Sequence, residues 1–246
     1  MTATSIKGFF FDLGGTLMYD KDPWPPFFPR ADNALWEVLY SAGVTLKPAD
    51  LYGKFDNLFE LYYAKREPEL EEPTTFTVLE ELLRQKGYRL PDTTISTALR
   101  AMYAVTQSNW YPETDAAPTL EILRSEGFRI GFVSNGADDE NTQVLIDKAG
   151  LRKYAEFIIS SAALGLRKPH RAIFEAALDY FQLKPDETVM VGDTLEADVL
   201  GANRMGMASI WITRRAQVDP DQENSIKPSL TVDTLSEIPD RLSELG

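Results

Sequence analysis

The sequence predicts an α/β fold, a doubly wound parallel sheet that carries an inserted all-helical unit. Short apolar runs alternate with segments of helical periodicity near both ends of the chain, and this alternation is typical of a parallel sheet covered by helices. Between residues 17 and 112 only helical patterns recur, so a helical insertion is expected there. A chain of 246 residues is long enough for one core and one such satellite.

Short apolar segments, several of them followed by glycine or polar turn residues, are predicted to form the strands of the core. They are Ile6–Asp12, Phe128–Ser134, Glu156–Ser160, Thr188–Gly192 and Ala208–Thr213. The first of them is aromatic and runs into Gly14-Gly15. That pattern indicates a buried central strand that stops in a tight loop.

Helices are predicted between these strands, and Gly127, Gly150 and Gly206 follow three of them as C-terminal stops. The predicted core helices are Thr119–Ser125, Asp138–Ala149, Arg171–Phe181 and Glu196–Met205. The polar stretch Gln217–Pro228 is interpreted as a surface loop. Residues 1–16 and 113–246 are therefore assigned to the α/β core, in which ligands bind at the carboxyl ends of the strands.

Residues 17–112 are assigned to a helical cap in which no strand is predicted. Its predicted helices are Asn33–Ser41, Ala49–Arg66, Thr75–Lys86 and Thr93–Gln107. Turn and breaker residues flank the cap at Asp20–Pro29 and at Tyr111–Glu113. The cap is therefore expected to sit on two hinges, where it can cover the loop after the first strand.

Composition limits the partners and the compartment. The formal net charge is −13 and Lys and Arg do not cluster, which disfavours nucleic acid and anionic membranes as partners. No apolar run approaches the roughly 20 residues of a membrane span. The absence of Cys excludes disulfides and thiolate metal sites. A cytoplasmic protein that binds a small molecule is expected.

Asp12 lies where the first predicted strand ends, and Leu13-Gly14-Gly15-Thr16 follow it. Its carboxylate is expected at the edge of the sheet, where the glycines let a ligand approach the backbone closely. An Asp in such a place is about as often a turn or helix cap as a functional group. Its interpretation as a nucleophile depends on the motifs that follow.

Three further motifs follow in chain order. Ser134-Asn135-Gly136 end the second strand with a hydroxyl and an amide suited to phosphate oxygens. Lys168 precedes a helix, and a cation near Asp12 would neutralise a transferring group and keep the nucleophile ionised. Asp193 ends a later strand and Asp198 follows within the opening turn of a helix, and hard oxygen ligands so arranged suit Mg²⁺.

In their order, the four motifs resemble those of the haloacid dehalogenase superfamily, over Phe9 to about Gly206. The resemblance implies that Asp12 attacks phosphorus and that Lys168 bridges the nucleophile and the phosphate. It implies phosphate binding by Thr16, Ser134, Asn135 and Gly136. It implies a Mg²⁺ site formed by Asp12, the Gly14 backbone carbonyl, Asp193 and Asp198, the last as a ligand or as a support of the metal. The helical insertion resembles the cap that family members place between the first two motifs.

Gly14 departs from the pattern of the family's phosphatases. They carry a second Asp at this position, which protonates the leaving oxygen and later activates water. Glycine keeps the carbonyl that would ligate the metal, but it lacks the proton shuttle. General acid and base assistance is typically worth about 10² to 10⁴ in rate, so alkyl phosphates would become poor substrates and good leaving groups would suffer less.

The first of three hypotheses is a Mg²⁺-dependent phosphatase for a small phosphorylated metabolite. Such an enzyme would favour aryl, acyl or anhydride phosphates, or it would take its acid from Tyr19, Asp20, His170 or the cap. The proline-rich aromatic segment Asp22–Arg30 faces the substrate or packs within the cap, and packing is the simpler interpretation.

Two other hypotheses stay open. Dehalogenase or phosphonatase chemistry uses the same aspartate without the second Asp, although a dehalogenase has no need of the Asp193–Asp198 pair. A binding or regulatory protein with a degenerate site is the third. This third hypothesis is disfavoured because an inactive site would not need to keep Asp12, Lys168 and Asp193 together.

Overall fold

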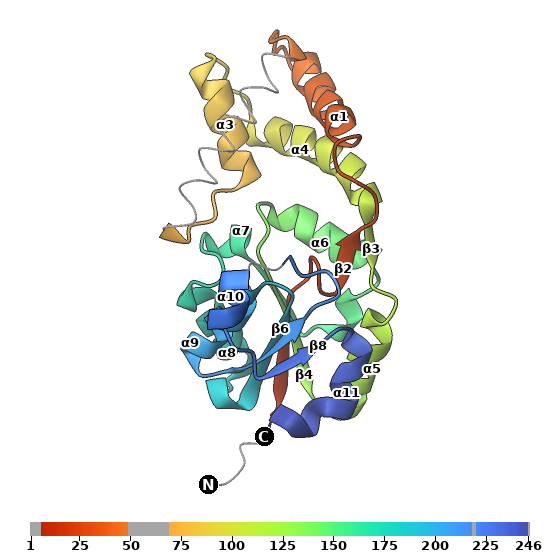
Figure 1. Cartoon of the computed structure of the whole chain (residues 1–246). Coiled ribbons are helices and arrows are strands. Elements are labelled where there is room, and N and C mark those ends of the chain that lie inside the picture. Colours follow the sequence, from red (N-terminus) through yellow and green to blue (C-terminus); the bar gives the residue numbers. More distant parts are fainter. Residues whose placement is uncertain (1–5, 49–68, 218–219, 246) are drawn as a thin grey trace.

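The computed structural model describes residues 6–48, 69–217 and 220–245. Its centre is a six-stranded sheet in the order β5-β4-β1-β6-β7-β8, and every pairing in it is parallel. The strands are β1 (Gly8–Phe11), β4 (Arg129–Ser134), β5 (Phe157–Ser160), β6 (Thr188–Gly192), β7 (Ala208–Ile212) and β8 (Leu230–Val232). Helices lie on both sides of this sheet (Figure 1). The predicted doubly wound α/β fold is confirmed.

Both faces of the sheet are packed, because successive residues of β1 enter different hydrophobic clusters. Phe9 and Phe11 pack with α5, α6 and α11, whereas Phe10 packs with α8 and α9. These helices are α5 (Ala116–Ser125), α6 (Asp139–Lys148), α8 (Arg171–Phe181), α9 (Gly201–Met205) and α11 (Ile238–Arg241). All three phenylalanines are fully buried. A central strand buried on both faces is apolar throughout, which explains the pattern of the first predicted strand.

Most predicted core elements form within two residues of their predicted bounds, and β6 has the predicted bounds. The predicted helix Glu196–Met205 differs, because a π-helical segment, η4 (Leu195–Leu200), precedes α9. Strand β8 was not predicted, and α10 (Pro220–Ser225) lies within the segment interpreted as a loop. The short helix α7 (Ser161–Leu164) follows β5. In the part of the chain that the structure describes, each helix is too short or too polar to cross a bilayer.

Three helices form a lobe above the carboxyl ends of the strands (Figure 1), and we call them the helical lobe. They are α1 (Phe28–Ser41), α3 (Thr75–Gln85) and α4 (Asp92–Thr106). The lobe has its own hydrophobic cluster, in which Leu35, Leu79 and Leu99 are buried. It therefore folds around its own apolar centre. The predicted helix Ala49–Arg66 lies outside the described residues.

The prediction of no strand between residues 17 and 112 is wrong. Strand β2 (Met18–Asp20) pairs antiparallel with β3 (Trp110–Pro112), and Tyr19 lies opposite Tyr111. Each strand has three residues and its partner is distant in the sequence, so local periodicity gives no signal for the pair. The two crossings between the sheet and the helical lobe thus run side by side. Leu17, at the start of the predicted cap, packs in the cluster of the α/β core.

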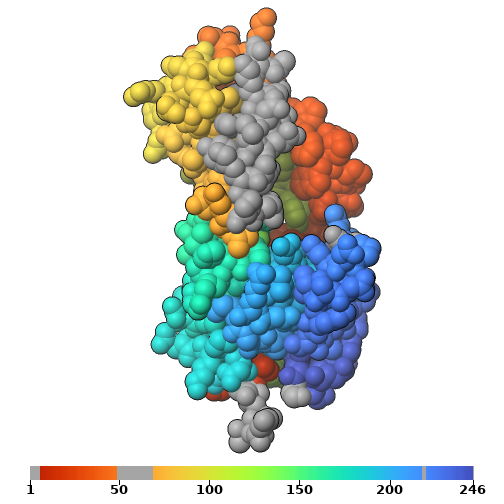
Figure 2. Space-filling model, turned by 60° about the vertical axis from the view of Figure 1, so that its left-hand side comes forward, coloured from red at the N-terminus to blue at the C-terminus, as the bar shows by residue number. Residues whose placement is uncertain are grey.

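The segment before α3 fastens the helical lobe to the core. The Glu72 N–H donates to the Gly165 carbonyl at 3.0 Å, and the Arg167 N–H donates to the Leu70 carbonyl at 2.9 Å. The N–H of Thr75 donates to the carbonyl of Ala137 at 2.9 Å. Figure 2 shows this orange segment seated on the green part of the core. The lobe is therefore docked over the strand ends.

Candidate active site

The order of the sheet brings three of the predicted site residues together. Strand β1 lies between β4 and β6, so the chain segments that follow these strands meet at one edge. Asp12 follows β1, Ser134 ends β4 and Asp193 follows β6. The Asp12 N–H donates to the carbonyl of Val191 at 2.9 Å, which continues the sheet by one residue. Crevices of this kind are the usual ligand sites of doubly wound sheets.

The ammonium of Lys168 lies at the centre of a buried ion-pair cluster. It donates to Asp12 Oδ1 at 2.6 Å, to Asp198 Oδ1 at 2.7 Å and to the Val133 carbonyl at 2.8 Å. An ammonium has three donors, and all three are used here. Burial on its own lowers the pKa of Lys168, but the charges of Asp12 and Asp198 outweigh burial and the pKa is raised. Lys168 is therefore a fixed positive charge beside Asp12.

Asp12, Asp193 and Asp198 form an acidic cluster whose ligand oxygens lie within 4.8 Å of one another. Burial, and then the charges of Asp12 and Asp198, raise the pKa of Asp193 to about 7. Burial raises the pKa of Asp198 to about 6, although Lys168 acts to lower it. Three carboxylates against one ammonium leave two negative charges when all are ionised. A divalent cation would balance them, and these hard oxygen donors fit Mg²⁺.

The backbone around the acidic cluster is shaped to hold its carboxylates. Gly15 has a φ of +79°, and a Cβ at this position would collide with the Asp193 carboxylate. The Thr16 hydroxyl lies 3.4 Å from Asp193 Oδ1, so this predicted phosphate ligand faces the acidic cluster. The N–H of Thr194 donates to Asp198 Oδ2 at 3.1 Å. Glycine at position 15 is thus needed both for its conformation and for the space that it leaves.

Two predicted phosphate ligands are engaged elsewhere. The side-chain amide of Asn135 donates to the Lys168 carbonyl at 3.0 Å and accepts from the Lys168 N–H at 2.8 Å. These two bonds fix the backbone of Lys168 beside Asn135. The Gly136 N–H donates to the Ser161 hydroxyl at 2.9 Å. Ser134 is buried and its side chain lines a cavity at the strand ends.

This cavity, which we call the Gly14 cavity, has a volume of about 150 Å³. Gly14 and Ser134 lie in its wall together with Trp110. A Cβ added at Gly14 would lie 3.3 Å from the Trp110 indole. Sequence reasoning missed Trp110, although it directly precedes the predicted hinge Tyr111–Glu113. The β2–β3 pair brings this residue from the far end of the insertion back to the first motif.

A family model for haloacid dehalogenase-like hydrolases matches residues 6–206. The chain belongs to this hydrolase family. This haloacid dehalogenase-like hydrolase is similar to the glyceraldehyde 3-phosphate phosphatase of Methanopyrus kandleri, with 28% identity over 98% of this chain and 99% of that protein. A glyceraldehyde 3-phosphate phosphatase of Methanothermobacter thermautotrophicus is 27% identical over 95% of this chain and 96% of that protein. The structure resembles a 2-haloacid dehalogenase from Pseudomonas syringae pv. Tomato DC3000, with a TM-score of 0.69, 25% identity and coverage of 98% and 100%.

None of Tyr19, Asp20 and His170, the candidate replacements for the second Asp, lines the Gly14 cavity of this hydrolase. His170 caps α8, because its Nδ1 accepts the N–H of Ala172 at 3.2 Å. The ring of Tyr19 lies 3.9 Å from the Arg215 guanidinium. Asp20 is exposed. The structure therefore offers no support for these three as the missing acid.

The raised pKa of Asp193 predicts that the metal-free hydrolase loses stability as the pH rises from about 4 to about 7. Below a pKa of about 7 the folded state holds a proton on Asp193 that the unfolded chain has already released. Raising the pH removes this proton and leaves the buried charge, so the free energy of unfolding falls. Thermal melting in the presence of a chelator measures the effect.

Asp193→Asn is the matched variant, because it removes the titrating group. Its melting temperature should change less between these pH values than that of the wild type. Mg²⁺ should raise the melting temperature of the wild type more at the higher pH, since metal binding requires ionised carboxylates. If the melting temperatures of the wild type and Asp193→Asn depend equally on pH, Asp193 is not the group that makes the stability pH-dependent.

Proposed function

We propose that this hydrolase is a Mg²⁺-dependent phosphatase that acts through an aspartyl phosphate on Asp12 and favours substrates with good leaving groups. The observation that carries the proposal is the Lys168 ammonium, which is bonded to both Asp12 and Asp198 beside the Asp193 carboxylate. Similarity to two glyceraldehyde 3-phosphate phosphatases over nearly the whole chain supports phosphate as the transferred group.

Asp12 attacks phosphorus through Oδ2, because Lys168 holds Oδ1. The bond between phosphorus and the leaving oxygen breaks, and its electron pair departs with that oxygen. A water molecule then attacks the phosphorus of the aspartyl phosphate, which releases phosphate and restores Asp12. The proton of that water goes to solvent, because Gly14 offers no base. Lys168 supports both steps by balancing the charge that gathers on the phosphoryl oxygens.

The phosphate is bound by the Ser134 hydroxyl and by the main-chain N–H of Asn135. The predicted ligands Thr16 and Gly136 support this site from behind, through their contacts to Asp193 and Ser161. When bound, Mg²⁺ neutralises phosphate charge and lowers the repulsion between the substrate and the acidic cluster. Its proposed ligands are Asp12, the Gly14 carbonyl, Asp193 and Asp198, the last directly or through water.

The helical lobe acts as a cap over this site. We assign residues 17–112 to the cap and residues 1–16 and 113–246 to the core. The bonds that join Thr75 to Ala137 and Glu72 to Gly165 fasten the cap in the position described here. A docked cap excludes bulk water from the phosphoryl group, and exclusion of bulk water strengthens the charge interactions around it.

Turnover of a panel of phosphate esters, with Mg²⁺ and with chelator, tests the proposal. Acetyl phosphate and 4-nitrophenyl phosphate should be hydrolysed only with Mg²⁺. A 2-haloacid such as 2-chloropropionate should be added without metal, because the resemblance to a dehalogenase makes carbon–halogen hydrolysis on Asp12 the competing reaction. If the protein releases halide from 2-chloropropionate but no phosphate from the phosphate esters, it is a dehalogenase and not a phosphatase.

Gly14→Asp should reduce the difference in kcat/KM between phosphates with good leaving groups and phosphates with poor ones. The wild type is expected to hydrolyse 4-nitrophenyl phosphate far better than an alkyl phosphate, because an alkoxide cannot depart without a proton. A restored acid would help the alkyl phosphate by up to about 10² to 10⁴. The measurement is kcat/KM for both substrates in both proteins.

The substitution is physically reasonable at this position. Gly14 is not among the glycines with positive φ, so a side chain causes no backbone strain there. Its Cβ would lie 3.3 Å from the Trp110 indole, which must give way by a few tenths of an ångström. Thermal melting should confirm the fold before rates are compared. If the folded variant gains nothing on alkyl phosphates and the wild type shows no leaving-group preference, protonation does not limit the reaction.

A further inference from the structure

The Gly14 cavity has the size and the lining of a site for one aromatic ring. Its volume is about 150 Å³, and an apolar protein cavity of about this size binds benzene. Met18, Leu145 and Trp110 supply apolar walls, whereas Ser134 stands at the phosphate end. Gly14 occupies the position from which a phosphatase of this family would protonate the leaving oxygen. The cavity therefore lies on the leaving-group side of the proposed reaction.

The indole of Trp110 is held in place as one wall of this cavity. Trp24 packs behind it, with ring centroids 6.0 Å apart, and Phe28 stacks on Trp24 at 6.2 Å. The side chain of Asn109 donates to the Asp22 carbonyl at 2.8 Å and accepts the Asp22 N–H at 2.9 Å. These bonds join Asn109, the residue before Trp110, to the first residue of the proline-rich aromatic segment Asp22–Arg30. A ring that enters the cavity therefore meets an indole whose position is already fixed.

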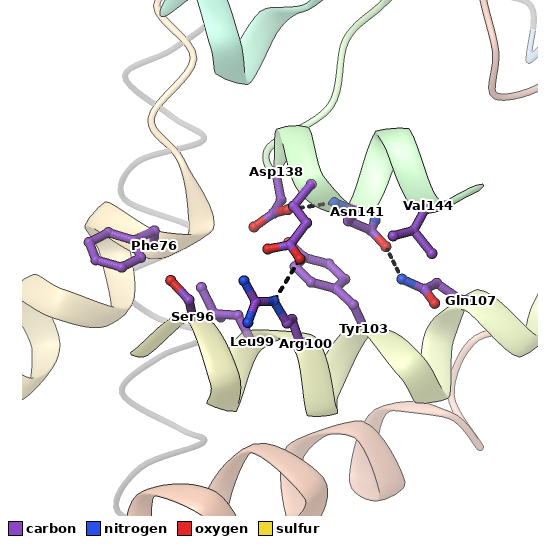
Figure 3. A pocket seen from close by; sticks show the side chains of 10 residues that line it. Phe76, Ser96, Leu99, Arg100, Tyr103, Gln107, Asp138, Asn141 and Val144 are labelled. Atoms are coloured by element: carbon purple, nitrogen blue, oxygen red, sulfur yellow. Dashed lines mark hydrogen bonds and ion pairs between the residues drawn. The ribbon is translucent and has the colours of Figure 1, made fainter. Parts of the chain in front are cut away.

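Asn141, in the wall of the Gly14 cavity, is hydrogen-bonded to Gln107. Asn141 of α6 lines the Gly14 cavity and also a second cavity of about 230 Å³ between α4 and α6. Figure 3 shows the second cavity, with Gln107 and Asn141 pointing toward each other. The Gln107 amide donates to Asn141 Oδ1 at 2.9 Å, and the Lys148 ammonium donates to Gln107 Oε1 at 2.7 Å. Asn141 is therefore shared by the walls of the two cavities, and Gln107 holds it from the side of the second cavity.

We propose that the substrate is an aryl phosphate with a single aromatic ring, which lies against Trp110, and that the Gln107–Asn141 pair limits the length of the leaving group. The inference rests on the proposed function. The site without an acid at Gly14 requires a leaving group that departs as an anion, and a phenolate meets this requirement. The apolar walls then select the ring among the possible good leaving groups.

Trp110→Ala tests the ring site in the full chain with Mg²⁺. The measurement is kcat/KM for phenyl phosphate and for acetyl phosphate, which has a good leaving group without a ring. The ratio of phenyl to acetyl phosphate should fall about 10-fold or more, because the ring loses its stacking partner and its apolar contact. Trp110→Phe should restore much of the ratio. Tyr40→Ala is the control, since Tyr40 is an exposed aromatic residue of α1 in the helical lobe.

Gln107→Ala tests the end wall, because it removes the hydrogen bond that holds Asn141 between the Gly14 cavity and the second cavity. The substrates are phenyl phosphate and 2-naphthyl phosphate, whose leaving groups have similar acidity and differ in length. The wild type should favour the single ring, and the variant should raise the ratio of naphthyl to phenyl turnover about 10-fold or more. Ser108→Ala is the matched control, since Ser108 is the exposed neighbour and bonds only within its own turn, to the carbonyl of Val105.

The outcomes separate the two proposals. If the wild type hydrolyses neither acetyl nor aryl phosphates, the proposed function is wrong and the inference falls with it. If the wild type hydrolyses acetyl phosphate but Trp110→Ala leaves the phenyl to acetyl ratio unchanged, the phosphatase assignment stands and the ring site is wrong. An unchanged naphthyl to phenyl ratio in folded Gln107→Ala refutes the end wall.

Discussion

Replacing Asp12 by asparagine is expected to abolish hydrolysis, with kcat lower by about 10³ or more. The amide has almost the shape of the carboxylate, but it cannot attack phosphorus. The fold should survive, because Lys168 keeps its bonds to Asp198 and to the Val133 carbonyl. The variant also removes one of the charges that raise the pKa of Asp193. Without metal, the melting temperature of Asp12→Asn should therefore be no lower than that of the wild type.

Turnover of 4-nitrophenyl phosphate and acetyl phosphate, measured beside thermal melting, checks this expectation. Asp147→Asn is the control, because Asp147 is an exposed carboxylate paired with Arg152 on the surface. It should leave turnover unchanged. Activity above about one per cent of the wild type in a folded Asp12→Asn protein would exclude Asp12 as the nucleophile.

Replacing Lys168 by methionine is expected to remove both activity and stability. The ammonium is the shared partner of Asp12, Asp198 and the Val133 carbonyl, and all of these are left without it in a buried site. Breaking a buried ion pair from one side costs about 3–5 kcal/mol in the free energy of unfolding. Hydrolysis should fall to background, because the charge on the phosphoryl group is no longer balanced. Denaturant unfolding and turnover measure the two losses.

A second substitution separates the structural part of this loss from the chemical part. In Lys168→Met/Asp198→Asn one uncompensated charge is gone, so part of the lost stability should return while turnover stays at background. Lys47→Met, at an exposed position, is the control for removing a positive charge. A Lys168→Met protein as stable as the wild type would contradict the account of a buried ion-pair cluster.

The sequence predicted those features of the fold that depend on neighbouring residues. The bounds of β6 and α8 were predicted to the residue, because apolar runs and helical periodicity are local signals. Gly127, Gly150 and Gly206 have positive φ at the ends of their helices, as expected for C-terminal stops. Parallel strands place Asp12, Ser134 and Asp193 at one edge of the sheet, and the strand order β4-β1-β6 makes them neighbours there.

Contacts between distant segments could not be predicted in this way. The β2–β3 pair joins two three-residue strands from opposite ends of the insertion, and neither shows a strand pattern. The place of Trp110 beside Gly14 depends on that pair. The two bonds between the Asn135 side chain and the backbone of Lys168 could not be predicted either, because the two loops approach each other only in the folded chain. His170, which follows Lys168 closely, faces a different cavity.

The antiparallel pairing of Tyr19 with Tyr111 makes the helical lobe an exchangeable module. Because its two connections to the sheet lie next to each other, a different helical unit with adjacent ends can be inserted between them without moving any strand. The nucleophile and the acidic cluster belong to the sheet and Trp110 belongs to the connecting strand β3, whereas Gln107 directly follows α4 of the lobe. A lineage that replaced the lobe would thus keep its chemistry and acquire a new substrate. The reaction mechanism and the substrate specificity can therefore be inherited separately.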